Sequence, residues 1–150
     1  MLVIAITLIV MGIILYIVDK KAESTVKYSK ITFKQAMLIG ISQSLAAAFP
    51  GVSRSGITMT VARALKIDRE SAAKFSFMLA APITLAAVVF DLNHFTFGLP
   101  FLFGVLASFL VGIIIIKFLL NYLKKGSFKI FAIYRIVIGL IVIGIFFTRI

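Results

Sequence analysis

The stretch Ala48–Gly56 reads AFPGVSRSG, and its polar residues interrupt an otherwise strongly apolar sequence. Its Pro-Gly pair is expected to end the preceding helix, because proline lacks a backbone N–H and glycine tolerates positive φ. Ser53 or Ser55 is a suitable N-cap for a following helix, whose first turn leaves N–H groups and partial positive charge that favour an anion. Arg54 adds a fork of donors shaped for phosphate. The stretch therefore predicts a phosphate site.

An alternative is that this stretch is only a turn between helices, with Arg54 paired to a carboxylate elsewhere in the chain. The flanking sequence favours the anion site over that alternative. An arginine placed between apolar segments at membrane depth is costly, and such residues usually face a site or a water-filled cavity.

The composition is that of an integral membrane protein. Of 150 residues, 62% are hydrophobic, and the mean hydropathy of +1.17 lies far above soluble-domain values. The net charge of +11 comes from basic residues in short gaps between apolar runs, a pattern typical of membrane topology and contact with anionic lipid headgroups, not of nucleic-acid binding. Cysteine is absent, and Asp91–His94 holds too few ligands for a metal.

Four apolar segments are long enough, or nearly so, to cross a bilayer. They are Leu2–Val18, Phe75–Leu92, Leu99–Leu120 and Ile130–Phe147. The first lacks a basic leader and a small-residue cleavage site, so we do not expect it to be a signal peptide. Pro82 is predicted to kink the second.

Two shorter segments, Thr32–Phe49 and Ser55–Lys66, lie between the first and second spans. At about 1.5 Å per residue they reach roughly 25 Å and 18 Å, and the second is too short for a hydrocarbon core of about 30 Å. We therefore predict a re-entrant helical hairpin over about residues 32–66. Its non-helical tip requires a lining of protein or water at that depth.

The basic residues predict the orientation of these segments. Three basic stretches are expected on the cytoplasmic side, namely Lys20–Lys30, Lys66–Lys74 and Lys117–Lys129. Arg63 and Arg135 are expected to reach toward a membrane interface with their long side chains. The alternatives are that Arg63 extends the basic lining of the site and that Arg135 has a buried partner.

Three groups of residues resemble the undecaprenyl-pyrophosphate phosphatase family, the bacterial enzymes linked to bacitracin resistance. They are Pro50–Gly56 (PGVSRSG), the preceding Gly40–Ala46 (GISQSLA), and Ala72–Phe77 (AAKFSF) with Pro82. The resemblance covers most of the chain. It implies a multi-pass enzyme of the bacterial plasma membrane that hydrolyses undecaprenyl pyrophosphate to undecaprenyl phosphate, the sugar carrier of cell-wall synthesis. It also implies an inverted-repeat fold, each half contributing a re-entrant hairpin.

The resemblance assigns roles to residues of the motif. Arg54 would hold the pyrophosphate as a catalytic residue, and Ser53 and Ser55 would donate hydrogen bonds to it. Gly51 and Gly56 would let the substrate approach the backbone closely. A donor cluster of this kind stabilises the charge that develops on a transferring phosphoryl group.

The resemblance covers only the C-terminal half of that family, as a single membrane domain over residues 1–150. The first half of the family supplies a Glu-rich motif, a Ser-rich turn and a histidine for acid–base, nucleophilic and divalent-metal chemistry. Here Glu23 and Glu70 fall in loops, His94 lies at the wrong end of a span, and Gln43 takes the place of the acidic motif by repeat symmetry, as a substrate-binding candidate. We expect a truncated or split protein that binds better than it catalyses, with Mg²⁺ or Ca²⁺ held outside this chain.

These considerations lead to three hypotheses. The first is a polyprenyl-diphosphate phosphatase, or half of one, with an N-terminal half or a second copy as partner. The second is a transporter or lipid-headgroup-binding protein, because inverted repeats with broken helices at the midplane are transporter architecture. The third is a fragment that packs but has no site. Release of phosphate distinguishes the first from the others.

Overall fold

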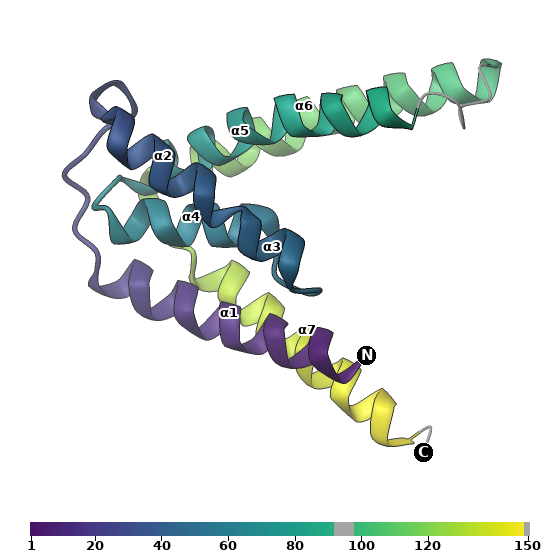
Figure 1. The fold of residues 1–150 in the computed structure, drawn as a ribbon, viewed down its shortest axis with the longest axis horizontal. Coiled ribbons are helices and arrows are strands. Elements are labelled where there is room, and N and C mark those ends of the chain that lie inside the picture. The colour runs from purple at the N-terminus through teal and green to yellow at the C-terminus, as the bar shows by residue number, and fades with distance from the viewer. Residues whose placement is uncertain (92–97, 149–150) are drawn as a thin grey trace.

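The computed structural model describes residues 1–91 and 98–148, and they form a bundle of helices (Figure 1). In chain order the α-helices are α1 (Leu2–Lys21), α2 (Phe33–Ser42), α3 (Ser44–Ala48), α4 (Arg54–Ala64), α5 (Arg69–Phe90), α6 (Leu99–Lys125) and α7 (Lys129–Thr148), with a short 3₁₀ helix, η1 (Tyr28–Lys30), before α2. Helices α1, α5, α6 and α7 are long and apolar enough to cross a membrane. The predicted all-α, multi-pass membrane class is confirmed.

The four long helices match the four predicted spans, and they extend further at their basic ends. Helix α5 begins at Arg69, six residues before the predicted start, because Asp68 caps it: the Asp68 carboxylate accepts from the Ser71 N–H at 2.9 Å. The helix continues through Pro82 without a break. The predicted loop at Asp91–His94 lies outside the described residues after Asp91.

The predicted first arm of the hairpin is divided into α2 and α3, and the second arm is α4. Thr32 begins α2 with a capping box that it shares with Gln35. Both α2 and α3 pack on α4, which returns toward the end where α2 began (Figure 1). The chain thus forms a helical hairpin; that the hairpin is re-entrant in a bilayer, and that it belongs to an inverted repeat, remain predictions.

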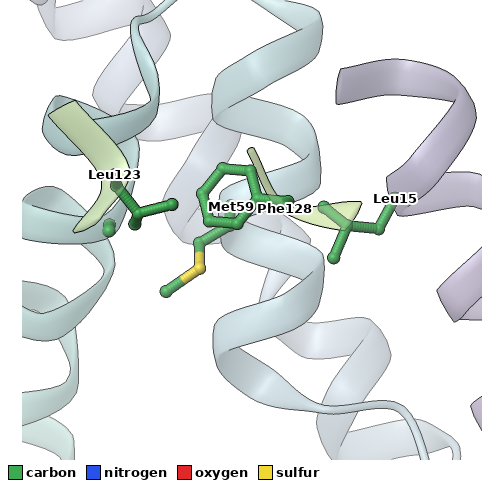
Figure 2. Packing of buried hydrophobic residues seen from close by; sticks show 5 residues of the cluster. Leu15, Met59, Leu123 and Phe128 are labelled. Atoms are coloured by element: carbon green, nitrogen blue, oxygen red, sulfur yellow. The ribbon is translucent and has the colours of Figure 1, made fainter. Parts of the chain in front are cut away.

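Helices α1 and α7 lie side by side and antiparallel (Figure 1). They approach closely at glycines, since a β-carbon at Gly139 would meet the Ala5 carbonyl at 2.9 Å. A cluster of buried apolar side chains joins α1, the middle of α4, the first part of α5 and the end of α6 to the residue before α7. Figure 2 shows Met59 and the Phe128 ring lying together between Leu123 and Leu15. By contrast, the α5–α6 hairpin projects from the other helices, and most of its apolar side chains are exposed.

The three basic stretches come together at one end of the molecule, which we call the basic end (residues 19–30, 66–74 and 117–129). The backbone N–H groups of Thr25 and Val26 donate to the Lys66 carbonyl, each at 3.0 Å. The N–H of Phe128 donates to Oδ2 of Asp19 at 3.1 Å. The structure therefore agrees with a common side for these stretches, and the identity of that side remains a prediction from the positive-inside rule.

The prediction for Arg63 was wrong, because its side chain is fully buried at the basic end. Its Nε donates to Oδ1 of Asp19 at 2.9 Å, its Nη1 to the Ile67 carbonyl at 2.6 Å, and its Nη2 to the Ala22 carbonyl at 2.7 Å. The carbonyls at two helix ends and one carboxylate satisfy the guanidinium inside the protein, so it has no need to reach water. It also lies at the opposite end of α4 from the motif, so it does not extend the lining of the site.

Candidate functional site

The site begins at the turn between α3 and α4, which rests on α1. Gly51 has φ of 91°, and a β-carbon there would strike Thr7 and the backbone of Ile4. Thr7 Oγ1 donates to the Pro50 carbonyl at 2.8 Å. Only glycine fits this position, both because of the positive φ and because of the space. Gly51 thus lets the turn pack closely on α1, and the predicted approach of substrate to its backbone stays a prediction.

Ser53 is the N-cap of α4, which settles the choice between the two serines. Its Oγ accepts from the Gly56 N–H at 3.3 Å and lies 3.3 Å from Oγ of Ser55. The first N–H groups of the helix, on Arg54 and Ser55, have no carbonyl within the helix to bind. The sequence therefore builds a helix start with open donors and two hydroxyls side by side.

Arg54 is the first residue of α4, and it is exposed. It lines a hollow of about 290 Å³ whose other walls are Ser53, Ser55, Ser76, Phe77 and Ala80. The alternative interpretation of the sequence was a simple turn in which Arg54 pairs with a carboxylate elsewhere in the chain. Among the described residues no carboxylate pairs with Arg54. The guanidinium is free to bind an anion that enters the hollow.

Arg135 of α7 is the residue that our interpretation of the sequence missed. A β-carbon at Gly56 would collide with the Arg135 guanidinium, so the two are in close contact. Nη1 of Arg135 is buried and has no hydrogen-bond partner among the described residues. The expectation that Arg135 reaches a membrane interface was wrong, because α7 packs on α1 in a way that points this side chain into the bundle. The available signal was a single cation inside an apolar span.

Arg135 and Gly56 also line a second cavity, of about 160 Å³, on the side of the core cluster. Ser55 and Phe77 line both this cavity and the hollow beside Arg54. The two guanidiniums therefore approach the start of α4 from two adjoining spaces. A buried hydrogen bond of 2.7 Å between Thr58 and Ser76 holds α4 to α5 next to them.

Gln43, the remaining predicted residue, lies at the junction of α2 and α3. Its backbone N–H donates to the Gly40 carbonyl at 3.1 Å. In the described parts of the chain no hydrogen bond links its side chain to the serines or arginines of the site. The proposed contact of Gln43 with substrate therefore stays a prediction.

The groups around the start of α4 suit an anion and not a metal ion. Two guanidiniums, two hydroxyls and open backbone N–H groups are all donors to phosphate oxygens. Divalent cations of the Mg²⁺ and Ca²⁺ type require carboxylate and carbonyl oxygens. Within residues 1–91 and 98–148 no three His, Asp or Glu side chains gather into a possible metal site. The divalent cation implied by the resemblance does not fit this donor set.

Comparison with known proteins relates the whole chain to one family. Residues 1–141 match the sequence model of a family described as bacitracin resistance protein BacA. Among curated relatives, a protein of Pelotomaculum thermopropionicum is 50% identical over 95% of this chain and 54% of its own length. A relative from Caldicellulosiruptor bescii is 44% identical over 99% of this chain and 57% of its own length. Both are named undecaprenyl-diphosphatase, and this chain spans a little over half the length of each.

Proposed function

Because this chain belongs to the bacitracin resistance protein BacA family, we propose that it supplies the diphosphate-binding part of an undecaprenyl-diphosphatase of the bacterial plasma membrane. The reaction is hydrolysis of undecaprenyl pyrophosphate to undecaprenyl phosphate and phosphate, which recycles the lipid carrier of cell-wall synthesis. The printed names of the curated relatives support this reaction. The chain contributes the anion site, with a lipid diphosphate as its ligand.

One observation carries the proposal: a buried arginine nitrogen beside the start of α4 has no partner among the described residues. A buried polar group without a hydrogen bond costs about 1–3 kcal/mol, and more when it is charged. A phosphate oxygen bound at the start of α4 would provide the missing acceptor, and Arg54 would bind the same diphosphate from the open side. Two positive charges match the charge of a diphosphate better than one.

The described side chains at the site hold and neutralise the substrate. Arg54 and Arg135 offset the negative charge that increases on the phosphoryl oxygens as the bond between the two phosphoryl groups of the diphosphate breaks. Ser53 and Ser55 donate hydrogen bonds to the same oxygens. We assign the acid, the base and the ligands of a divalent cation to groups outside this chain, in an N-terminal half or in a second copy.

A second candidate is a protein that binds or moves a lipid headgroup without hydrolysis. The observation that favours it is the donor set itself, because no Asp, Glu or His of the described residues lies with the guanidiniums and hydroxyls at the start of α4. The names of the relatives favour the phosphatase over this candidate.

The test of the function is phosphate release from a polyprenyl pyrophosphate by the purified chain in detergent. The chain is assayed alone and with a family-type N-terminal half, each with and without Mg²⁺ or Ca²⁺. We expect phosphate release only with the added half. Release by the chain alone would contradict the assignment of the acid and base to outside groups, and binding without release in every arm would favour the second candidate.

The test of the site is Arg54→Ala, with binding of pyrophosphate measured by calorimetry. We expect a loss of affinity of about a hundredfold, since a hydrogen-bonded charged contact is worth up to about 3 kcal/mol. Arg54→Lys should recover only a small part, because a point charge replaces a planar fork of donors. Unchanged affinity in Arg54→Ala would contradict the assignment of the site.

A further inference from the structure

The carboxylate of Asp19 joins the ends of four helices at the basic end. It belongs to α1 and is 3% exposed. Its Oδ1 accepts from Nε of Arg63 on α4 at 2.9 Å and from Nε of Arg69 on α5 at 2.8 Å. Its Oδ2 accepts from the N–H of Phe128, directly before α7, at 3.1 Å. One buried side chain thus fixes the position of α4 and of α7 relative to α1.

A second junction of the same helices lies two helical turns away from Asp19. Its members are Gly12 of α1, Gly56 of α4 and Arg135 of α7. On each segment, seven residues separate the two junctions. The pairs are Gly12 with Asp19, Gly56 with Arg63, and Arg135 with Phe128. Seven residues make two turns of about 10.5 Å in total, with a drift of about 20° around the axis. The matching steps place the three residues at one level of the bundle.

The contacts at this second junction are close ones. A β-carbon at Gly12 would lie 3.0 Å from the Ala132 carbonyl and 3.3 Å from Cβ of Arg135. Helix α7 therefore approaches α1 closely at the level where its arginine turns toward Gly56. Helix α1 packs against both α4 and α7, so the meeting of Arg135 with Gly56 depends on where each of these two helices stands along α1.

We infer that Asp19 is a positioning residue for the diphosphate site, holding α4 and α7 at the register in which the Arg135 guanidinium meets the start of α4. A slip of one residue along either helix moves its side chains by about 1.5 Å and turns them by about 100°. Either change takes the guanidinium away from Gly56. The inference deepens the proposed function and rests on it, since it concerns the same anion site.

The charge of Asp19 and its position act in opposite directions on anion binding. A negative charge about 10 Å from the site repels a diphosphate, so its removal should tighten binding if only the charge mattered. Loss of the register should weaken binding. The sign of the change therefore separates a positioning role from an electrostatic one.

The experiment is calorimetry of inorganic pyrophosphate binding to the full chain in detergent, comparing wild type with Asp19→Asn, each with and without Arg135→Met. We expect Asp19→Asn to weaken binding about tenfold. This is the effect of losing about one hydrogen bond between the Arg135 guanidinium and the diphosphate. In the Arg135→Met background the same change should leave affinity within about twofold. Glu70→Gln, an equal charge change at the basic end, is the matched control and should leave affinity unaltered.

A second variant covers the case in which Asp19→Asn fails to fold. Replacing Asp19→Leu together with Arg63→Met removes the fully buried pair, and such replacements are often neutral for stability. Arg69, the other guanidinium on Asp19, is partly exposed, so water can hydrate its charge. A folded double variant should still bind pyrophosphate about tenfold more weakly. Tighter binding in either variant, or equal weakening with and without Arg135, would overturn the inference.

A readout without ligand keeps the inference separate from the proposed function. Spin labels at Ala64→Cys on α4 and Val137→Cys on α7 report the register by electron–electron distance, and the chain has no cysteine of its own to interfere. We expect a shifted or broader distance distribution in Asp19→Asn. If wild type fails to bind pyrophosphate, the proposed function fails, and an unchanged distribution would overturn the positioning role independently.

Discussion

Each end of α4 lies next to an arginine that is buried at least in part, and the two arginines differ in their hydrogen-bond partners. At the C-terminal end, Arg63 is fully buried and hydrogen-bonded to Asp19 and to several backbone carbonyls. At the N-terminal end, Arg135 contacts Gly56 and leaves Nη1 without a partner among the described residues. The guanidinium at one end of α4 is thus hydrogen-bonded within the protein. The guanidinium at the other end has a nitrogen without a partner among the described residues.

This difference is the one we expect between an arginine that stabilises the fold and an arginine that binds a ligand. A buried charge is tolerated when it is paired and fully hydrogen-bonded. An unpaired donor in the same bundle lowers stability, and it persists where a bound group provides the acceptor. The comparison predicts that substitutions at the C-terminal end change stability and that substitutions at the N-terminal end change affinity.

The largest expected effect comes from Arg63→Ala. Removal of the guanidinium leaves buried carbonyls unsatisfied and takes from Asp19 one of its two positive partners, so we expect a loss of roughly 3–5 kcal/mol of unfolding free energy. Denaturant unfolding in mixed micelles measures it. A loss below 1 kcal/mol would mean that the basic end is not held by this pair, and the two ends of α4 would no longer differ.

Arg135→Met should have the opposite profile. We expect pyrophosphate affinity to fall by about ten- to a hundredfold, the range for a lost hydrogen bond to a charged group. The melting temperature without ligand should stay the same or rise, because an unsatisfied buried donor is removed. A large fall in melting temperature would show that Arg135 stabilises the fold as Arg63 does.

A smaller effect is expected from Gly56→Ala, which adds a methyl group where the guanidinium lies. The end of the arginine side chain can move aside, so we expect affinity to fall by less than about tenfold and stability to be maintained, because alanine favours a helix over glycine by about 1 kcal/mol. Calorimetry and thermal melting of the same samples test both parts. In an Arg135→Met background the substitution should no longer weaken binding.

The smallest effect is expected at the exposed pair of Glu23 and Lys66, whose Nζ and Oε2 are 2.9 Å apart. The hydrogen bond from Lys66 lowers the pKa of Glu23. Any stabilisation by the pair is therefore present at neutral pH and is lost as the pH falls through that lowered pKa. Exposed pairs contribute little, so Glu23→Gln should leave the melting temperature unchanged at pH 7, in contrast to changes at Asp19.

Much of the fold followed from local sequence, and the failures were all long-range. Apolar length predicted the four spans, and the Pro-Gly pair with Ser53 predicted the turn and the cap of α4, because these depend on neighbouring residues. The partner of Arg63 is Asp19, 44 residues earlier, and no local pattern links them. Arg135 lies near the start of its span, and for that reason the sequence predicted that its side chain reaches the membrane interface. The packing of α7 on α1 instead points the side chain into the bundle.

The equal two-turn spacings between the junctions at Asp19 and at Gly12 limit where residues can be inserted into this chain or deleted from it. One residue gained or lost between Phe128 and Arg135, or between Gly56 and Arg63, would turn the site by about 100° while leaving every apolar helix long enough to span a bilayer. Extra residues at the outer ends of α5 and α6 would alter neither junction. The chain is thus free to vary in length at its projecting hairpin and fixed in length along three short helical segments.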